Sequence, residues 1–289
     1  MPSMKKRLLI WTLTALMLCF SAVFPTVAEE KAGDDGVTIL CLNVGKGDAI
    51  LIRAEGQCFL VDTGYKRTAD ALMKMLEREG VTRLNGVFLT HNHKDHYGGL
   101  NALCTSGIRI DAFYTSAYCQ DGFGADHPLV IAAARRGQTV RPLKGGDQVR
   151  LSDTAVFDVL APVRLNNDNE NNNSLVMRLE TADGSVLLTG DMKFEEEYDL
   201  ISQGLLRQTD VLKVAFHGDN SSTSMPFLSA VRPRVGLIST STAEEKDTPS
   251  RDVLQRLASV GCAIYVTQDA AYAVRVVLKD GKAAVTREQ

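Results

Sequence analysis

The sequence predicts an α/β fold with four layers, in which two β-sheets pack face to face between two outer layers of helices. The chain has two halves, and in each half strand-like runs are followed by helix-like runs. In both halves, histidine or aspartate side chains directly follow a strand-like run. Because a sheet or helix must bury its apolar side against another element, an αββα sandwich satisfies this pattern. With 289 residues, 45% of them hydrophobic, the chain can fill a sizeable core.

Three short strands separated by turns open the first half. They are expected at residues 37–43, 49–53 and 58–64, where β-branched and apolar residues dominate and glycine-containing turns intervene. Residues 68–78 then repeat apolar side chains at helical spacing. This stripe predicts a helix that lays one face on the sheet.

The later elements alternate between strands and helices. Further helices are expected at residues 100–104, 126–136, 194–203 and 250–259. Further strands are expected at residues 86–89, 109–115, 174–180, 184–189, 235–239, 263–266 and 271–278, with short pieces between 139 and 160. Residues 166–173 are polar and rich in asparagine, and their composition alone predicts a flexible surface loop.

One polar run dominates the first half. Three of the five histidines of the chain, His91, His93 and His96, fall within it, and Asp95 lies between the last two. The preceding apolar strand and the following Gly98-Gly99 place these side chains on a tight loop at a strand end. Neutral imidazoles bind transition metals, and a carboxylate adds a harder oxygen donor. The run therefore predicts a site for one or two metal ions.

The pattern His-x-His-x-Asp-His after a short hydrophobic strand resembles the metal motif of the metallo-β-lactamase superfamily. Its sub-pattern resembles the metallo-β-lactamase-like domain of ComEC-type DNA-uptake proteins and the free-standing relatives of that domain. Four further stretches resemble that pattern in the same order, over about residues 37 to 280. They are Val44-Gly45-Lys46-Gly47-Asp48 with Asp62-Thr63-Gly64, Asn172-Asn173-Ser174-Leu175-Val176, Thr189-Gly190-Asp191, and Leu212-Lys213-Val214 with His217.

The resemblance implies a two-metal site and a metal-dependent hydrolase. One ion would be held by His91, His93 and Asp191, and a second by Asp95, His96, Asp191 and His217. Asp95 and Asp191 carry the catalytic assignment, because they hold and bridge the ions that lower the pKa of the attacking water. Zinc suits the imidazole-rich set, whereas manganese tolerates its carboxylates.

The same resemblance suggests supporting or substrate-binding residues around the ligands. Asp62 would orient the histidine loop by hydrogen bonds, although a carboxylate that caps a strand end is nearly as compatible with the sequence. Lys46 would hold an anionic substrate group or would be a solvated surface charge. Asn173 and Ser174 are candidates for indirect contacts to the ions, and Ser222 and Ser224 belong to a retained Ser-Thr-Ser run.

The chain also departs from the family pattern. Phe216 stands where the pattern has a histidine, Asp219 where it has a serine, and Asn43 where it has an aspartate. The segment before the last helix lacks a further histidine. The departures at Phe216 and Asp219 and the missing histidine keep open a catalytically degenerate binding module on the same fold. The remaining histidine, His127, has no ligand-spaced neighbour and is expected to be a surface or helix-capping residue.

The N-terminus predicts export. Residues 1–28 combine a basic start, an uncharged apolar run and a small residue at the end, which is typical of a secretory signal; an uncleaved membrane anchor is the alternative. Residues 29–36 form a polar linker, and residues 37–289 the hydrolase domain. The protein is therefore expected to be secreted, or to face the outside on its anchor. A disulfide between Cys104 and Cys119 and buried free thiols are both compatible with this location.

Charge limits the choice of substrate. Residues 1–28 hold three of the 32 basic residues and none of the 35 acidic ones, so residues 29–289 carry a formal charge of −6. Non-specific nucleic-acid binders usually carry a basic surface, which disfavours nucleic acid as a bulk partner. The expected substrate is a small or polymeric phosphoester, cleaved at a phosphodiester bond. A cell-wall phosphoester or a lactam is the alternative substrate for an exported hydrolase.

Overall fold

The computed structural model describes residues 36–122 and 124–289. The predicted signal or anchor at residues 1–28, and all but the last residue of the predicted linker at 29–36, lie outside the described residues. Within the described residues, no helix has the length and apolar character needed to cross a bilayer.

Two mixed sheets form the centre of the fold. The first has strand order β17-β16-β1-β2-β3-β5-β7-β8 and the second β15-β14-β13-β12-β11-β10-β9. The first sheet contains β1 (Val37–Leu42), β2 (Ile50–Ala54), β3 (Gln57–Val61), β5 (Gly86–Leu89), β7 (Phe113–Ser116), β8 (Val140–Leu143), β16 (Ala273–Lys279) and β17 (Lys282–Glu288). The second contains β9 (Gln148–Arg150), β10 (Val156–Ala161), β11 (Val176–Thr181), β12 (Gly184–Leu188), β13 (Val211–Lys213), β14 (Val235–Ile238) and β15 (Ala263–Val266). A separate short pair joins β4 (Arg83–Leu84) to β6 (Arg109–Ile110).

Each sheet is antiparallel in one part and parallel in the other. β1, β2 and β3 pair antiparallel, whereas β3, β5, β7 and β8 run parallel. In the second sheet, β9 to β12 are antiparallel and β12 to β15 are parallel. Parallel neighbours bring their carboxyl ends to one edge of a sheet, which is where ligand sites form in such folds.

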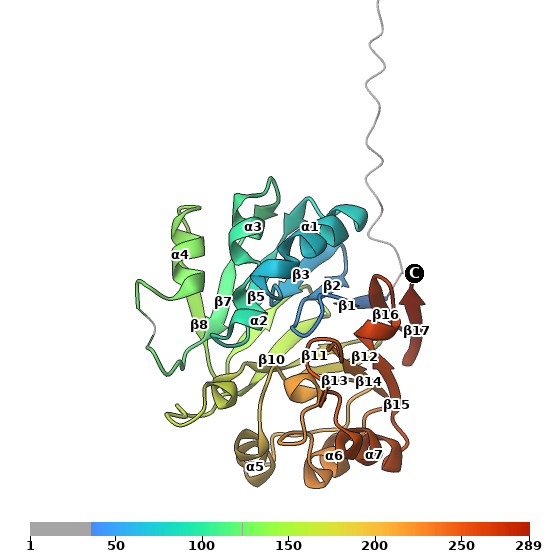
Figure 1. The fold of residues 1–289 in the computed structure, drawn as a ribbon. Coiled ribbons are helices and arrows are strands. Elements are labelled where there is room, and N and C mark those ends of the chain that lie inside the picture. Colours follow the sequence, from blue (N-terminus) through green and yellow to red (C-terminus); the bar gives the residue numbers. More distant parts are fainter. Residues whose placement is uncertain (1–35, 123) are drawn as a thin grey trace, which may run out of the picture. The chain divides into compact units, whose positions relative to one another are not determined.

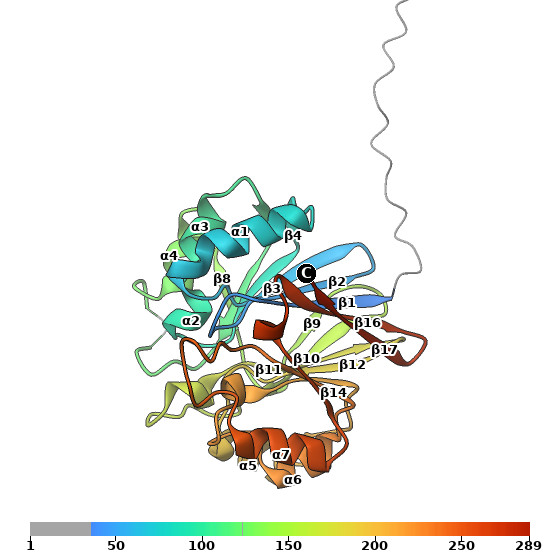
Figure 2. The same ribbon diagram turned by 45° about the vertical axis from the view of Figure 1, so that its right-hand side comes forward.

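Helices cover the outer faces of the two sheets (Figures 1 and 2). On the first sheet lie α1 (Ala69–Arg78), α3 (Leu100–Thr105) and α4 (Pro128–Ala134), and on the second α5 (Phe194–Ser202), α6 (Met225–Val231) and α7 (Arg251–Ser259). Leu72 and Leu103 share one buried cluster with Leu60 of β3, and Phe227 and Leu257 share another with Leu212 of β13. Short helical turns complete the fold: η1 (Lys66–Thr68), α2 (Lys94–Tyr97), η2 (Glu170–Asn173), η3 (Ala215–Gly218) and η4 (Thr267–Asp269).

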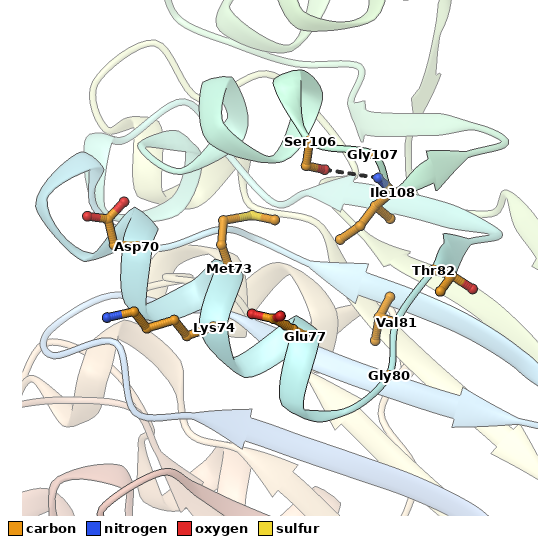
Figure 3. A pocket seen from close by; sticks show the side chains of 10 residues that line it. All are labelled: Asp70, Met73, Lys74, Glu77, Gly80, Val81, Thr82, Ser106, Gly107 and Ile108. Atoms are coloured by element: carbon orange, nitrogen blue, oxygen red, sulfur yellow. Dashed lines mark hydrogen bonds between the residues drawn. The ribbon is translucent and has the colours of Figure 1, made fainter.

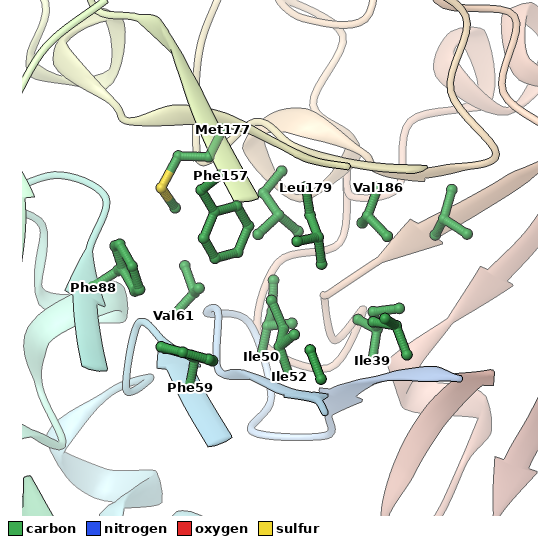
Figure 4. Close-up of a cluster of buried hydrophobic side chains, with 14 of the residues drawn as sticks. Ile39, Ile50, Ile52, Phe59, Val61, Phe88, Phe157, Met177, Leu179 and Val186 are labelled. Carbon is green, nitrogen blue, oxygen red and sulfur yellow. The ribbon is translucent and has the colours of Figure 1, made fainter. Parts of the chain in front are cut away.

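A third apolar cluster fills the space between the two sheets (Figure 4). Ile50, Phe59 and Phe88 of the first sheet face Phe157 and Met177 of the second, and all five are buried. The rings of Phe88 and Phe157 meet edge to face with centroids 5.4 Å apart. The predicted four-layer αββα sandwich is therefore the observed arrangement.

Local capping explains where several helices begin. His127 caps α4, with Nδ1 accepting from Leu129 N at 3.3 Å, and Pro128 occupies the first helical position. Ser224 and Ser250 cap α6 and α7 in the same way, through Phe227 N and Val253 N. His127 is thus a capping residue as one of the two expectations had it, but it is buried rather than on the surface.

Two expectations about secondary structure were wrong, and two elements were missed. The strand expected at residues 109–115 is split into β6 and β7, which belong to different sheets. The sequence analysis missed α6 and the edge strand β17. The asparagine-rich run is not an exposed loop at its end, since the residues of η2 are buried. Glu170 explains this burial, because its carboxylate accepts hydrogen bonds from Asn92 N, Gln120 N and the side chain of Asn173.

Candidate metal centre

Three strand ends supply the polar side chains of the site. β5 leads into Thr90 and the histidine run, β12 leads into Asp191, and β13 leads into η3, which carries His217. The first of these strands belongs to one sheet and the other two to the second. The backbone connects the sheets at this point, because Leu175 N donates to Thr90 O at 2.9 Å.

Four side chains from these segments form a compact donor cluster. Asp95, His96, Asp191 and His217 each place one ligand atom within 4.8 Å of the others. Oδ2 of Asp191 lies 3.2 Å from His96 Nε2 and 3.3 Å from His217 Nε2. His217 Nε2 is also 3.3 Å from Asp95 Oδ2. These are the residues expected to hold the second ion.

The unused atoms of this cluster fit a cation. Nε2 of His96, Nε2 of His217 and Oδ1 of Asp191 are buried and make no hydrogen bond to any described residue. The other ring nitrogens are occupied, since His96 Nδ1 lies 2.8 Å from Asp62 Oδ2 and His217 Nδ1 lies 2.8 Å from Ser239 O. A partner on Nδ1 fixes the tautomer that offers Nε2 to a metal. Two imidazoles and two carboxylates are a donor set for zinc or manganese.

The donor atoms expected to hold the first ion do not all lie close together. Nε2 of His91 points at Nδ1 of His93, 3.0 Å away, and lies 3.8 Å from Oδ2 of Asp191. Among the described residues, these three do not form a group whose donor atoms all lie within 4.8 Å of one another. The structure therefore brings the second expected ligand set together more closely than the first.

The carboxylates of the cluster raise the pKa of its two histidines. Burial acts to lower the pKa of His217, but Asp191 and Asp95 raise it to about 9. Burial likewise acts to lower the pKa of His96, and the carboxylates beside it, Asp191 first, hold it well above 6.5. The pKa of Asp191 stays well below its ordinary value, because these two histidines outweigh the effect of burial. A divalent cation would supply the same compensation in place of the two protons.

The family follows from a comparison with known sequences. A family model described as the metallo-beta-lactamase superfamily matches residues 42–242, a span that includes all four residues of the donor cluster. The chain belongs to the metallo-beta-lactamase superfamily. The donor cluster is its candidate site for one or two divalent ions.

Relatives and solved structures agree with this assignment. The chain is 27% identical over 262 residues to "ComE operon protein 3" of Bacillus subtilis, covering 84% of this chain and 32% of that protein. It thus spans about a third of the length of this relative. It is 40% identical over 62 residues to human "Zinc phosphodiesterase ELAC protein 1", covering 21% of this chain and 16% of that protein. The crystal structure of Tm1679, a metal-dependent hydrolase of the beta-lactamase superfamily, has a TM-score of 0.55 at 13% identity and covers 85% of this chain and 100% of its own; this likeness concerns the fold.

Asp62 contacts the histidine loop of the metallo-beta-lactamase motif through hydrogen bonds. It directly follows β3 in the left-handed backbone region, with φ of 60°, and is almost fully buried. Its Oδ1 accepts from Thr90 N and its Oδ2 from Thr90 Oγ1, both at 2.8 Å. Oδ2 also faces His96 Nδ1. One carboxylate therefore holds both the start of the histidine loop and the orientation of one donor imidazole.

The serines have different positions relative to the donor cluster. Ser174 Oγ accepts from Asp191 N at 3.1 Å and so holds the turn that presents this carboxylate. Ser222 Oγ donates to Ala215 O or Asp219 O, each at 3.0 Å, on either side of His217. Ser224 caps α6 instead, and nothing in its contacts connects it to the cluster.

Asn173 and Lys46, two other residues expected to support the site or bind substrate, contact side chains of this chain. Asn173 bonds to both backbone groups of Asn166 and to Glu170, which orders its own loop. The ammonium of Lys46 lies 3.6 Å from Oε2 of Glu245. Its side chain is 21% exposed, so this ion pair leaves part of it open to solvent. Of these two residues, Lys46 is therefore the one that remains accessible for binding a solute.

The five described cysteines are all free and buried. Cys104 and Cys119 therefore do not form the disulfide that the sequence left open. Burial acts to raise the pKa of both thiols, to about 11 for Cys119. Such thiols are structural rather than reactive.

The turn that carries His217 is strained. Phe216 and His217 both adopt positive φ, 47° and 54°, and Gly218 follows at 81°. A positive φ is uncommon for a bulky residue without special support and costs on the order of 1–3 kcal/mol. The hydrogen bond from Phe216 N to Gly190 O ties the turn to the segment that presents Asp191. Sequence patterns carry no signal for this backbone geometry beyond the single glycine.

The sequence analysis also missed a buried ion pair beside the cluster. Lys213 Nζ lies 2.7 Å from Asp48 Oδ2, and each side chain is 1% exposed. Both residues stand in the motifs that resemble the superfamily, so their place in those motifs was the available signal.

A separate cavity of about 530 Å³ lies between α1 and the segments after α1 and α3 (Figure 3). Met73, Val81 and Ile108 line it with apolar surface, and Lys74 and Glu77 stand at it on α1. None of its lining residues belongs to the donor cluster. The metal centre and this cavity are therefore distinct features of the fold.

Proposed function

We propose that this protein is an exported hydrolase that cleaves phosphodiester bonds with a divalent cation held by Asp95, His96, Asp191 and His217. The observation that carries the proposal is the buried cluster in which three donor atoms lack any other partner. The similarity to a protein named as a zinc phosphodiesterase supports the choice of bond. The character of residues 1–28 supports a place outside the cytoplasm, and similarity to "ComE operon protein 3" of Bacillus subtilis and "Competence protein ComA" of Neisseria gonorrhoeae is consistent with it.

The residues of the chain would divide the work as follows. A bound divalent cation supplies Lewis acidity and lowers the pKa of water at the site. Asp62 holds His96, and Ser174 holds Asp191, so both donors are fixed before substrate arrives. Lys46, half-buried at the glycine-rich turn, would attract the negative charge of the phosphoester.

Zinc is our first choice of cation, and manganese the second, since the cluster mixes imidazole with carboxylate donors. A second ion at His91 and His93 would take its third ligand from Asp191, whose Oδ2 lies 3.8 Å from His91 Nε2. The donor atoms of these three described residues do not all lie within 4.8 Å of one another. We therefore expect the cluster of Asp95, His96, Asp191 and His217 to bind a cation more tightly than that pair.

Metal content and phosphodiesterase activity should be measured together on protein purified without chelator. We expect one or two ions per chain and hydrolysis of bis-p-nitrophenyl phosphate that depends on added zinc or manganese. His96→Ala should lower metal content and hydrolysis together, because it removes a donor atom. His127→Asn is the matched control: it removes a histidine outside the cluster and keeps a capping side chain.

Three outcomes would contradict the proposal. Folded protein that binds metal but cleaves no phosphodiester, while hydrolysing a lactam, would move the function to the alternative substrate class. Folded protein without metal or hydrolysis would favour a binding module. His96→Ala with unchanged metal content would refute the assignment of the cluster.

A further inference from the structure

Lys213 occupies a strand position where an apolar side chain is expected. Side chains alternate along a strand, and on β13 Val211 belongs to the core between the sheets while Leu212 belongs to the core beneath the helices. Lys213 therefore points back between the sheets, where it is 1% exposed. A lysine is almost never fully buried unless it is paired. Its burial here demands a specific partner.

That partner is Asp48, from the glycine-rich turn of the first half. The two charged groups lie 2.7 Å apart, and Lys213 Nζ also donates to Val214 O at 3.1 Å. Burial acts to lower the pKa of Lys213, but Asp48 outweighs it and the pKa lies above the ordinary value. The ammonium thus stays charged, and it joins a loop of one half to a strand of the other.

Asp48 adjoins the donor cluster without belonging to it. Its second oxygen, Oδ1, is buried with no hydrogen bond to any described residue, and it lies 3.6 Å from His217 Nδ1. The backbone N of Asp48 donates to Asp95 O at 3.2 Å. An oxygen of Asp48 also lies within 4.8 Å of donor atoms of Asp62 and His96. A buried carboxylate so close to the ligands acts on any cation they hold.

We propose that Lys213 is a positioning residue that cancels the charge of Asp48 and thereby sets how tightly the donor cluster holds its cation. The inference rests on the proposed function, because it concerns the same cluster. Charges a few ångströms apart interact strongly in a buried environment, where water does not screen them. Because the charges of Asp48 and Lys213 cancel, the electrostatic attraction on the cation comes from Asp95 and Asp191. Asp48 alone would strengthen that attraction, and Lys213 alone would weaken it.

This mechanism predicts opposite signs for the two single substitutions. Asp48→Asn leaves a buried ammonium unopposed near the cluster, and cation affinity should fall at least tenfold. Lys213→Met leaves a buried carboxylate unopposed, and cation affinity should rise about threefold or more. The double variant K213M/D48N removes both charges, and its affinity should return to within about threefold of the wild type.

Calorimetric titration of the chelator-treated full chain with Zn²⁺ and with Mn²⁺ tests these signs directly. Hydrolysis of bis-p-nitrophenyl phosphate and thermal unfolding are measured beside it. Where circular dichroism finds K213M unfolded, Lys213→Gln takes its place, because it keeps a polar group at this position. Arg178→Met is the matched control, since Arg178 is a buried cation paired with Glu180 and its contacts reach no residue of the donor cluster. It should lower the melting temperature and leave cation affinity unchanged.

A purely structural role for the pair gives a different result. Both single substitutions would then destabilise the fold and weaken cation binding together, and the double variant would not restore it. That outcome overturns the inference while leaving the proposed function intact. Wild-type protein without cation affinity would instead contradict the proposed function, and the inference with it.

Discussion

At the scale of single residues, the site depends on side chains that would not touch the cation. Asp62 receives two hydrogen bonds from Thr90 and faces His96 Nδ1, so one buried carboxylate fixes a loop and an imidazole at once. Ser174 does the same for the backbone before Asp191. Such support narrows the positions that a donor can adopt, and so reduces the entropy lost when a cation binds.

Asp62→Asn should weaken cation binding by about 10–100-fold, the usual effect of losing such a partner. The amide keeps an acceptor for Thr90 but replaces the carboxylate that faces His96 Nδ1. Competition with a chromogenic chelator measures the change. Asp111→Asn, on the surface pair with Arg83, should leave affinity as it is. Equal affinity of D62N and wild type would limit Asp62 to capping its strand.

Glu196 is a second residue-scale case, on the buried side of α5. Its Oε1 has no hydrogen-bond partner among the described residues, and burial, with Asp199 nearby, raises its pKa from 4.5 to about 8. The folded state therefore favours the protonated form. The resulting destabilisation is absent below pH 4.5, grows as pH rises, and is complete above about pH 8.

Glu196→Gln should accordingly stabilise the protein more as pH rises. We expect a gain on the order of 2–4 kcal/mol at pH 8.5 and little change at pH 4.5. Urea unfolding at the two pH values measures the difference. Glu77→Gln, on the exposed face of α1, is the control and should change stability little at either pH. A gain that does not depend on pH would contradict this account of Glu196.

At the scale of elements, helix ends and turns set the positions of the ligands. Ser224 is the N-cap of α6, and its side chain accepts from Phe227 N. Glu197 of α5 accepts from the backbone of Thr223 and Ser224. These bonds hold the segment that follows the His217 turn against α5. The Ser-Thr-Ser run is thus explained at least in part by helix capping.

Ser224→Ala should cost about 1 kcal/mol of stability, the usual effect of losing an N-cap. Metal content and the KM for a phosphodiester should stay unchanged, because the side chain serves the helix. Chemical denaturation and steady-state kinetics measure both effects. Ser224→Asp, which restores a capping acceptor, should recover most of the stability. A raised KM in S224A at unchanged stability would return Ser224 to the substrate-binding residues.

At the scale of the whole molecule, the two halves share one core and one site. The cluster between the sheets contains residues from β1 to β16, and the donors come from segments of both sheets. Phe88 and Phe157 meet across this interface with centroids 5.4 Å apart. The two sheets should therefore unfold together rather than in sequence.

Phe157→Ala should remove about 3–5 kcal/mol of stability, because it opens a cavity in the core between the sheets. A single urea transition, seen alike by circular dichroism and by loss of the bound cation, is expected for this variant and for wild type. Tyr198→Ala, at a side chain that is 69% exposed, serves as the control. Two separate transitions in F157A would mean that the halves are independent units.

Much of this architecture could be predicted from the sequence, for reasons that differ between residues. The histidine run and Asp191 follow apolar strands directly, so short-range patterns place them at a sheet edge. The pairing of Lys213 with Asp48 joins residues far apart in the chain, and each charge alone is typical of a solvated residue. β17 is an edge strand rich in charged residues, and its pairing with β16 provides the order that composition does not. Glu170 likewise orders an asparagine-rich run that looks mobile by composition.

The buried thiols have a consequence for biogenesis. All five described cysteines are reduced and inaccessible once the chain has folded. Under the proposed export, the chain would reach an oxidising compartment before it folds, with its sulfhydryls exposed and no native disulfide among the described cysteines. Folding of the sandwich would then compete with the formation of non-native disulfides. The fold that positions the metal ligands would also be the protein's own protection against oxidation.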